Sequence, residues 1–314
     1  FRATKQWFIA VDKPATAGDA AGRSLRDAAM DVTADQVQFY PEWGQNRMRG
    51  MIESRPDWCL SRQRAWGLPI PAFFNEQGEP LLTAASIRAV ARFLGEHGSD
   101  AWFQADPADL LKDYDPHADP DAPKWLSADP GTVTRLGKST DIFDVWFESG
   151  SSWNAVVRAR FGDEWFPADL YLEGSDQHRG WFQLSLLPAL GATGGSPFKN
   201  VLTHGFMVDK HGHKMSKSDG NTIEVEDLLK DYGADVCRWW ISSLNTDNDI
   251  KADNEYFKIA GEEYREVRNT IRYLLSNLGD FDPPEDTRTP VGADPTSLDA
   301  WALGELNQLI RTVA

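Results

Sequence analysis

Between residues 141 and 244 the sequence alternates short apolar segments with polar turns and amphipathic segments, and this alternation constrains the fold more than any other feature. Short apolar runs bounded by glycine and charged residues predict strands, and apolar residues at spacings of three and four predict helices. Strands that alternate with helices form a parallel sheet, so the predicted fold class is α/β. The predicted strands are 142–147, 169–173 and 201–208, and the predicted helices are 180–190, 225–232 and 235–244.

The first 140 residues have a different texture. They contain a strand-like segment at 6–11, a polar amphipathic stretch and an aromatic turn at 40–44. Prolines and glycines exclude a long helix across 51–75, and a helix is predicted at 84–95 with Gly95 as its end. The segment 105–137 is predicted to be mostly loop, and ten aspartates between residues 100 and 144 indicate the solvated surface of an acidic insertion.

The final part of the chain is helical. Apolar residues from Phe257 to Leu278 alternate spacings of three and four, with Asp253 or Asn254 as the predicted cap and Gly279 as the predicted end. Residues 280–296 form a predicted linker, and a second helix begins near Leu298. We therefore expect three parts, 1–140, 141–252 and 253–314, of which the last is the start of an α-helical bundle.

Both ends of the chain suggest a piece of a longer protein. The sequence opens on Phe1 without an initiator methionine, and the spacing of the last helix continues almost to residue 314 without a stop signal. We therefore expect an internal fragment.

Composition narrows the partners and the compartment. The net charge is −16, whereas an autonomous nucleic-acid-binding module is usually basic, so strong binding of RNA by this chain is not expected. The two cysteines provide neither a disulfide framework nor a Cys-x-x-Cys metal pair, which is typical of the reducing cytoplasm. No apolar run of about 18 residues and no signal peptide are present, so no membrane partner is expected.

The most informative short segment is 213–221, His-Lys-Met-Ser-Lys-Ser-Asp-Gly-Asn. Lys214 and Lys217 lie three residues apart in a polar loop after a predicted strand, with Ser216 and Ser218 beside them. When ATP is attacked at its α-phosphorus, negative charge grows on the departing pyrophosphate, and two mobile lysines can stabilise it. For any single lysine the alternative is a solvated basic turn, but the complete motif at 213–221 makes a phosphate-binding loop the better interpretation.

Two further segments suggest a ligand site. In 171–182 a strand ends at Gly174, which lets a ligand approach the backbone, and Asp176 and Gln177 offer groups suited to ribose hydroxyls. Helix capping is the alternative role for these polar residues. Trp146 and Trp181 could wall an apolar amino-acid pocket, with plain core packing as the alternative.

Two other patterns are similar to a phosphate-binding motif and to a metal site, but neither assignment is supported. Gly137-Lys138-Ser139 is similar to the end of a phosphate-binding P-loop, but its spacing is wrong and a strand follows instead of a helix. His211 and His213 lack a third ligand at a recognisable spacing, so a polar hairpin turn is expected there instead of a metal site.

Taken together, these motifs make the sequence resemble the isoleucyl-tRNA synthetases of class I over essentially the whole chain. The resemblance rests on Arg-Pro-Asp-Trp-Cys-Leu-Ser-Arg-Gln-Arg-Ala-Trp-Gly at 55–67, Asp-Val-Trp-Phe-Glu-Ser-Gly at 144–150, the segment 171–182 and the lysine loop. Valyl and leucyl enzymes are the near alternatives, and a non-catalytic binding module derived from a synthetase is a more distant one. The resemblance implies the C-terminal half of a Rossmann-like catalytic domain with insertions.

The resemblance also implies roles for individual residues. Lys217 is similar to the main ATP lysine of the family, assisted by Lys214. Trp146 and Trp181 resemble the isoleucine side-chain pocket. The residues implied to contact ATP or the adenylate are Glu173, Gly174, Asp176, Gln177, Phe206, Met207, Val208, Ser216 and Ser218.

The activity implied for the longer protein is the joining of isoleucine to tRNA(Ile), using ATP with its Mg²⁺ and no metal bound by this chain. The family carries a second ATP signature, His-Ile-Gly-His, and no His-x-Gly-His occurs in this sequence. The first half of the nucleotide fold and the editing domain are therefore expected to be missing, and the fragment alone is expected to be inactive.

Overall fold

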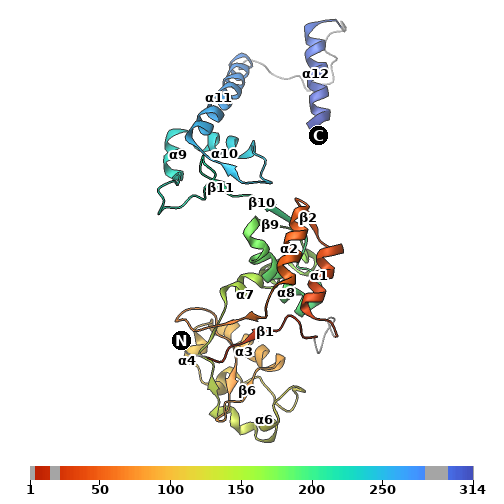
Figure 1. Ribbon diagram of the computed structural model, residues 1–314, viewed down its shortest axis with the longest axis vertical. Coiled ribbons are helices and arrows are strands. Elements are labelled where there is room, and N and C mark those ends of the chain that lie inside the picture. Colours follow the sequence, from red (N-terminus) through yellow and green to blue (C-terminus); the bar gives the residue numbers. More distant parts are fainter. Residues whose placement is uncertain (1–3, 15–21, 280–295, 314) are drawn as a thin grey trace. The chain divides into compact units, whose positions relative to one another are not determined.

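The computed structural model describes residues 4–14, 22–279 and 296–313 (Figure 1). Contacts divide the chain into two units. Unit 1 comprises Phe1–Gly220 with Asn245–Lys251, and unit 2 comprises Asn221–Leu244 with Ala252–Ala314.

A parallel three-stranded sheet forms the centre of unit 1. Its order is β2 (Gln38–Tyr40), β10 (Phe198–His204) and β9 (Ala168–Gly174), and both pairings are parallel. The ladder between β9 and β10 runs from Phe198 opposite Ala168 to His204 opposite Gly174. The predicted parallel α/β sheet is thus confirmed, and so are the strand at 169–173 and the helix that follows it.

Three helices complete this core: α1 (Leu25–Asp35), α2 (Trp43–Glu53) and α8 (Trp181–Thr193). Helix α8 is apolar on nearly all sides, so it is buried on most of its surface and packs against the sheet. Its Phe182 and Leu186 join Phe39 of β2, Tyr171 of β9 and Val201 of β10 in one cluster. In place of the aromatic turn expected at 40–44, the structure has the end of β2 and the start of α2.

The predicted strand at 142–147 is wrong. Strand β8 comprises only Ile142–Phe143, and helix α7 (Val145–Gly150) follows at once. Asp144 explains the change, because its carboxylate accepts the backbone N–H of Trp146 at 3.2 Å and so caps the helix. A π-helical segment, η2 (Trp153–Phe161), and a 3₁₀ turn, η3 (Asp163–Trp165), lead on to β9.

A second cluster of unit 1 forms between residues 73 and 138, around β5 (Phe73–Phe74), β6 (Pro80–Leu81) and β7 (Gly137–Lys138). Helix α3 (Ala84–His97) runs through the predicted end at Gly95 and stops before Gly98, whose φ of +83° suits glycine. The segment predicted as mostly loop contains short helices. They are α5 (Pro107–Leu110), α6 (Lys124–Ala128) and the 3₁₀ turn η1 (Pro130–Arg135), and α4 (Ala101–Gln104) precedes them.

Two aspartates contradict the expected solvated surface. Asp119 is buried and accepts hydrogen bonds from Thr83 at 2.6 Å and Tyr114 at 2.8 Å. Burial alone would raise the pKa of Asp119, but these donors and the Asp121 N–H hold it below its usual value. Asp144 is buried as well, beside Trp58 and Arg62.

The remaining short strands tie the chain's segments together. Strand β1 (Phe8–Ile9) pairs with β3 (Trp58–Cys59), and β4 (Ser61–Arg62) pairs with β8, both antiparallel.

Lys138 donates to the carbonyl oxygens of Trp102 and Ala105, both at 2.6 Å. That lysine is therefore a structural residue, in agreement with the rejection of a P-loop at 137–139.

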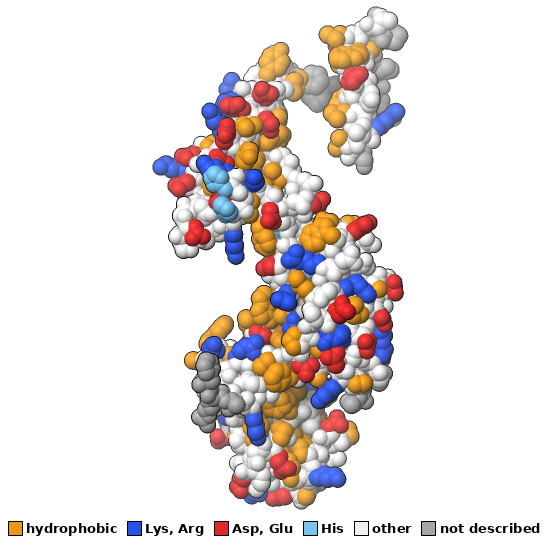
Figure 2. Space-filling model, in the orientation of Figure 1, with side chains coloured by type: hydrophobic (Ala, Val, Ile, Leu, Met, Phe, Trp, Pro, Cys, Tyr) orange, Lys and Arg blue, Asp and Glu red, His pale blue; other side chains and the backbone are white. Residues whose placement is uncertain are grey.

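Unit 2 is helical, with α9 (Val225–Asp231), α10 (Ala234–Ser242), α11 (Asn254–Asn277) and α12 (Leu298–Val313). Asp253 caps α11 as predicted, and the rings of Trp240 and Phe257 pack at 4.3 Å. Figure 2 shows apolar side chains along both α11 and α12. Nearly all of the predicted linker lies outside the described residues. None of the described helices is long and apolar enough to span a membrane.

The crossing of α7 and α8 at Gly150 leads to a stability prediction. A Cβ atom at Gly150 would stand 2.1 Å from the backbone oxygen of Leu184, so Gly150→Ala should lower the free energy of unfolding by about 1–3 kcal/mol through overpacking. In α2, Gly50 has no atom near its Cβ position, and Gly50→Ala should raise stability by about 0.5–1 kcal/mol. Urea unfolding of both variants measures the difference. A Gly150→Ala variant as stable as the native protein would contradict the close crossing.

Candidate active site

The carboxyl ends of β9 and β10 bring the predicted ligand-binding segments together. Gly174 pairs with His204 at the last position of the ladder, and the 3₁₀ turn η4 (Ser175–His178) follows directly. Ring carbons of Phe206 lie 3.0 Å from the position that a Cβ of Gly174 would occupy. Only glycine leaves this gap between the strand end and the aromatic ring.

The acidic and amide groups of this turn are partly committed to the backbone. Gln177 Oε1 accepts the N–H of Trp181 at 2.8 Å, so Gln177 caps α8. Its Nε2 donates to Asp176 at 3.2 Å, and the exposed Glu173 carboxylate accepts the Gly174 N–H at 3.0 Å. Gln177 therefore has the alternative role considered for these residues, which is helix capping. Asp176 and Glu173 are exposed at the strand ends.

His178 holds the turn in place, and the sequence analysis gave it no role. The ring is fully buried, its Nδ1–H donates to the Ser175 carbonyl at 2.9 Å, and Nε2 lies 3.4 Å from the Thr203 hydroxyl on β10. Phe182 meets it edge-on at 5.5 Å. The spacing of four residues between His178 and Phe182 is the signal that could have identified an inward-facing histidine.

The two predicted pocket tryptophans both lie close to Gly180. Trp181 stacks on Tyr171 with ring centroids 4.1 Å apart, and its indole N–H donates to the Ser149 carbonyl at 3.0 Å. Trp146 is 40% exposed, and its ring edge stands 3.4 Å from the Cβ position of Gly180. The structure thus places both indoles beside the same turn, and the exposure of Trp146 sets it apart from core packing.

The predicted strand at 201–208 is interrupted, which corrects the sequence analysis. Strand β10 ends at His204, and Met207–Val208 form β11, which pairs in parallel with β12 (Ile250–Lys251) outside the main sheet. The segment Asn245–Lys251 causes the break. Its Thr246 carbonyl accepts the Gly205 N–H and its Asp249 carboxylate accepts the Phe206 N–H, both at 2.8 Å.

This arrangement places the three residues expected along adenine in different surroundings. Phe206 and Met207 are exposed, and Val208 is buried. Asp249, which holds the Phe206 backbone, was missed because nothing in a polar run between two helices reveals a tertiary hydrogen bond.

The lysine loop continues from β11. The Asp209 N–H donates to the His213 carbonyl at 2.9 Å, which confirms the polar hairpin expected at the two histidines. The hydroxyl of Ser216 donates to Asp219 at 2.7 Å and lies 2.9 Å from that of Ser218. Lys217 is exposed and makes no ion pair among the described residues.

Some predicted neighbours are not joined by direct contacts. Within the described part of the chain, Lys217 and Ser218 make no hydrogen bond to the turn at 174–180. The connection runs through β11 and Phe206 instead. Nor do the described residues include a cluster of three or more histidine, cysteine or acidic side chains that could hold a metal ion.

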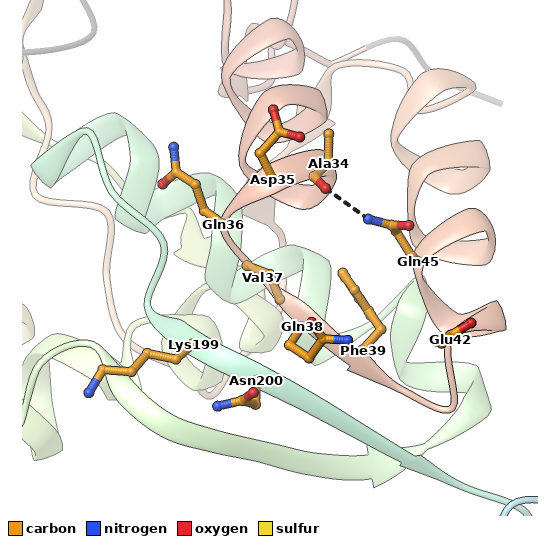
Figure 3. Close-up of a pocket in the computed structure, with 10 residues that line it drawn as sticks. All are labelled: Ala34, Asp35, Gln36, Val37, Gln38, Phe39, Glu42, Gln45, Lys199 and Asn200. Carbon is orange, nitrogen blue, oxygen red and sulfur yellow. Dashed lines mark hydrogen bonds between the residues drawn. The ribbon is translucent and has the colours of Figure 1, made fainter.

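A separate cavity of about 380 Å³ opens at the amino ends of the strands, opposite the candidate active site (Figure 3). It lies where β2 and β10 begin, and its polar wall includes Gln45, whose amide donates to the Ala34 carbonyl at 3.0 Å. Since ligands of parallel sheets bind at the carboxyl ends of the strands, this cavity is distinct from the candidate active site.

The parallel sheet with its packed helices defines an α/β domain of the Rossmann-like kind. The chain belongs to the family of class I tRNA synthetases (I, L, M and V), whose model matches residues 1–253. It is 44% identical over 311 residues to the isoleucine–tRNA ligase of Thermoanaerobacter sp. (strain X514), covering 99% of this chain and 30% of that protein. The isoleucine–tRNA ligase of Campylobacter fetus is 44% identical over 317 residues, covering 100% and 32%.

Solved structures support the fold at lower identity. Methionyl-tRNA synthetase of Mycobacterium tuberculosis bound by methionyl-adenylate matches with a TM-score of 0.56 at 17% identity, over 92% of this chain and 45% of that one. The leucyl enzyme of Agrobacterium radiobacter K84, in a ternary complex with tRNA, gives 0.52 at 19% identity, over 74% and 30%. The chain thus spans about a third of the length of the curated relatives that it matches.

The buried histidine of the turn predicts a pH dependence of stability. Burial lowers the pKa of His178, the Ser175 carbonyl partly opposes this, and Arg47 adds to the lowering. Because the folded pKa lies below the unfolded value of about 6.5, its contribution is complete above that pH and is lost as the pH falls toward the folded pKa.

Between pH 7.5 and 5 the free energy of unfolding should therefore fall, with a slope of at most about 1.4 kcal/mol per pH unit from this group. His178→Gln should flatten that slope in urea unfolding. His117→Gln is the control, because His117 is exposed and its substitution should leave the slope unchanged. Equal slopes in all three proteins would contradict the neutral buried imidazole.

Proposed function

We propose that this chain is part of a longer enzyme that activates isoleucine with ATP and transfers it to tRNA(Ile). The observation that carries the proposal is the 44% identity to isoleucine–tRNA ligases over 99% of the chain, lysine loop included. The chain would contribute the second half of the catalytic domain and the start of the helical bundle.

The proposed chemistry needs no covalent intermediate on the protein. The isoleucine carboxylate attacks the α-phosphorus of ATP, a bond to the bridging oxygen breaks, and pyrophosphate leaves with the charge. Lys217, assisted by Lys214, stabilises that charge more in the transition state than in the ground state. Ser216 and Ser218 shape the loop through the hydroxyl contacts described above. The Mg²⁺ ion would arrive with ATP as part of the substrate.

The strand ends would hold the adenylate. Asp176 would contact the ribose through its exposed carboxylate, and Gln177 would do so through the N–H of its amide that does not bond to Asp176. Gly174 would allow close approach, and the Phe206 ring beside it would offer an apolar surface for adenine. Glu173 would contact the aminoacyl part. Met207 and Val208 would support the adenine strand through the pairing of β11 with β12. Positioning of the reacting groups is the main catalytic contribution of these residues.

The amino-acid pocket is proposed beside Gly180, between the indoles of Trp146 and Trp181. Trp181 is held rigidly by its stack on Tyr171 and its bond to Ser149, so it can present a fixed apolar face. Such a pair of aromatic walls suits a branched aliphatic side chain.

Contacts to tRNA would depend mainly on other parts of the longer enzyme. The net charge of −16 opposes general attraction to a polyanion. Figure 2 shows acidic and basic side chains interspersed on the visible face. Any contact by this chain must therefore be local.

A substitution in the lysine loop tests the transition-state role. In the longer enzyme, Lys217→Ala should lower the rate of isoleucine-dependent pyrophosphate exchange by about 10²–10³-fold, because one stabilising cation is lost. The dissociation constant for isoleucine should change little. Lys210→Ala, an exposed lysine seven residues earlier, is the control and should leave both quantities unchanged. Equal losses in exchange and in isoleucine binding would argue against the role.

A second measurement concerns the 314-residue chain alone. We expect no isoleucine-dependent pyrophosphate exchange, because the sequence lacks the second ATP signature and a half-formed clamp cannot position the phosphates. The longer enzyme, assayed in parallel, is the positive control. Robust exchange by the chain alone would show that this signature is not required.

A further inference from the structure

Arg55 is a partly buried arginine between α2 and β3 whose charge is not balanced locally. Its Nη1 donates to the Oε1 of Gln183, and its guanidinium lies over the Trp58 ring at 5.6 Å. The Nε–H is buried and has no acceptor among the described residues. The partners of Arg55 are thus an amide and an aromatic face, both of which are neutral.

The charged groups near Arg55 do not neutralise it. Arg179 is a second cation, and burial together with Arg179 lowers the pKa of Arg55 against the opposing effect of Asp144. The Asp144 carboxylate already accepts from Trp58 at 3.0 Å and from Arg62 at 2.9 Å. Burying a charge without a partner is costly, so this arrangement calls for an anion.

Gln183 gives an independent indication at the same place. Its side chain is 0% exposed, its Oε1 is taken by Arg55, and its Nε2 has no acceptor in the described part of the chain. Two buried N–H donors therefore lack acceptors among the described residues, and they belong to two side chains that are joined by a hydrogen bond. A carboxylate has two oxygens and can satisfy both donors while neutralising the guanidinium.

We propose that Arg55 and Gln183, with Arg179 nearby, form a carboxylate-binding site filled by an acidic side chain from a part of the longer protein outside these 314 residues. The relatives are about three times as long as this chain, so most of the longer protein is available to supply it. The inference rests on the proposal that the chain belongs to a longer protein, and not on the identity of its substrate.

The carboxylate of the amino-acid substrate is the other source of the same chemistry, and the helix argues against it. Gln183 follows Trp181 by two residues in α8, and a helix turns about 100° per residue, so the two side chains leave opposite faces. An amino acid held by Trp181 does not reach Gln183. Moreover, a buried guanidinium needs its partner when no substrate is bound.

A zero-length crosslink identifies the partner. In the longer protein, Arg55→Lys places an amine at the site, and a carbodiimide would join it to the adjacent carboxylate as an amide. The native pair Lys199–Asp169, at 2.7 Å, is the positive control for the chemistry, and Arg160→Lys on exposed η2 is the matched control position. Mass spectrometry of the digest locates the linked peptides. The experiment needs no enzymatic activity.

We expect a link from position 55 to a peptide outside this chain, with none from position 160 to that peptide. A link to an acid within the 314 residues, or no link at 55 while Lys199 and Asp169 are joined, would overturn the proposal. With isoleucine present, an adduct of isoleucine at position 55 would overturn it as well, because the substrate would then be the source.

Melting temperatures provide a second readout. In the longer protein Arg55→Gln should lower the melting temperature, because it leaves a buried carboxylate without its partner. In the 314-residue chain the same substitution removes an unbalanced charge and should leave the melting temperature equal or higher. Arg160→Gln should be neutral in both. A similar decrease for Arg55→Gln in both proteins would contradict an external partner.

Discussion

The parallel ladder between β9 and β10 determines where the candidate active site can form. Its last pair, Gly174 with His204, brings two strand ends together, and the site segments leave from those ends. His178 links the first turn to β10, because its Nε2 lies 3.4 Å from the Thr203 hydroxyl. Its hydrogen bond to the Ser175 carbonyl stays within the turn, so packing of the buried ring against Phe182 contributes more than charge to the position of the turn.

The segment Asn245–Lys251 adds a constraint of a different kind. It interrupts the strand after His204 and holds Gly205 and Phe206 by backbone and carboxylate hydrogen bonds. A Cβ at Gly205 would stand 2.2 Å from Asn248, so this contact needs a glycine. The lysine loop is thus attached to the sheet through two hydrogen-bonded residues, and Lys217 lies exposed in the turn that follows the hairpin at 208–214.

Sequence periodicity predicted the elements that follow local apolar spacing, and it failed where a side-chain hydrogen bond to the backbone decides the outcome. The strand β9 and the helices α8, α10 and α11 follow local apolar spacing, and all were found. The strand expected at 142–147 became a helix because the Asp144 carboxylate caps it. The strand expected at 201–208 was divided because Asp249, more than forty positions away, takes the Phe206 N–H. In the candidate site, the segment 171–182 predicted ligand contacts by Gly174, Asp176 and Gln177, which stay predictions, and no role was predicted for the buried His178.

Hydrogen bonds to residues far away in the sequence also decide which charged side chains are buried. An aspartate-rich stretch suggested a solvated surface, yet Asp119 and Asp144 are buried because Thr83, Tyr114, Trp58 and Arg62 supply donors to them. Arg55 is the converse case, because it is a partly buried cation without an acidic partner among the described residues.

Strand β9 also has backbone groups without partners in the described sheet. Among the described strands it pairs only with β10, and Leu170 and Leu172 are 47% and 51% exposed. The unpaired edge of β9 can accept backbone hydrogen bonds, whereas the proposed partner of Arg55 is a carboxylate, so the two features differ in the chemical group that would satisfy them.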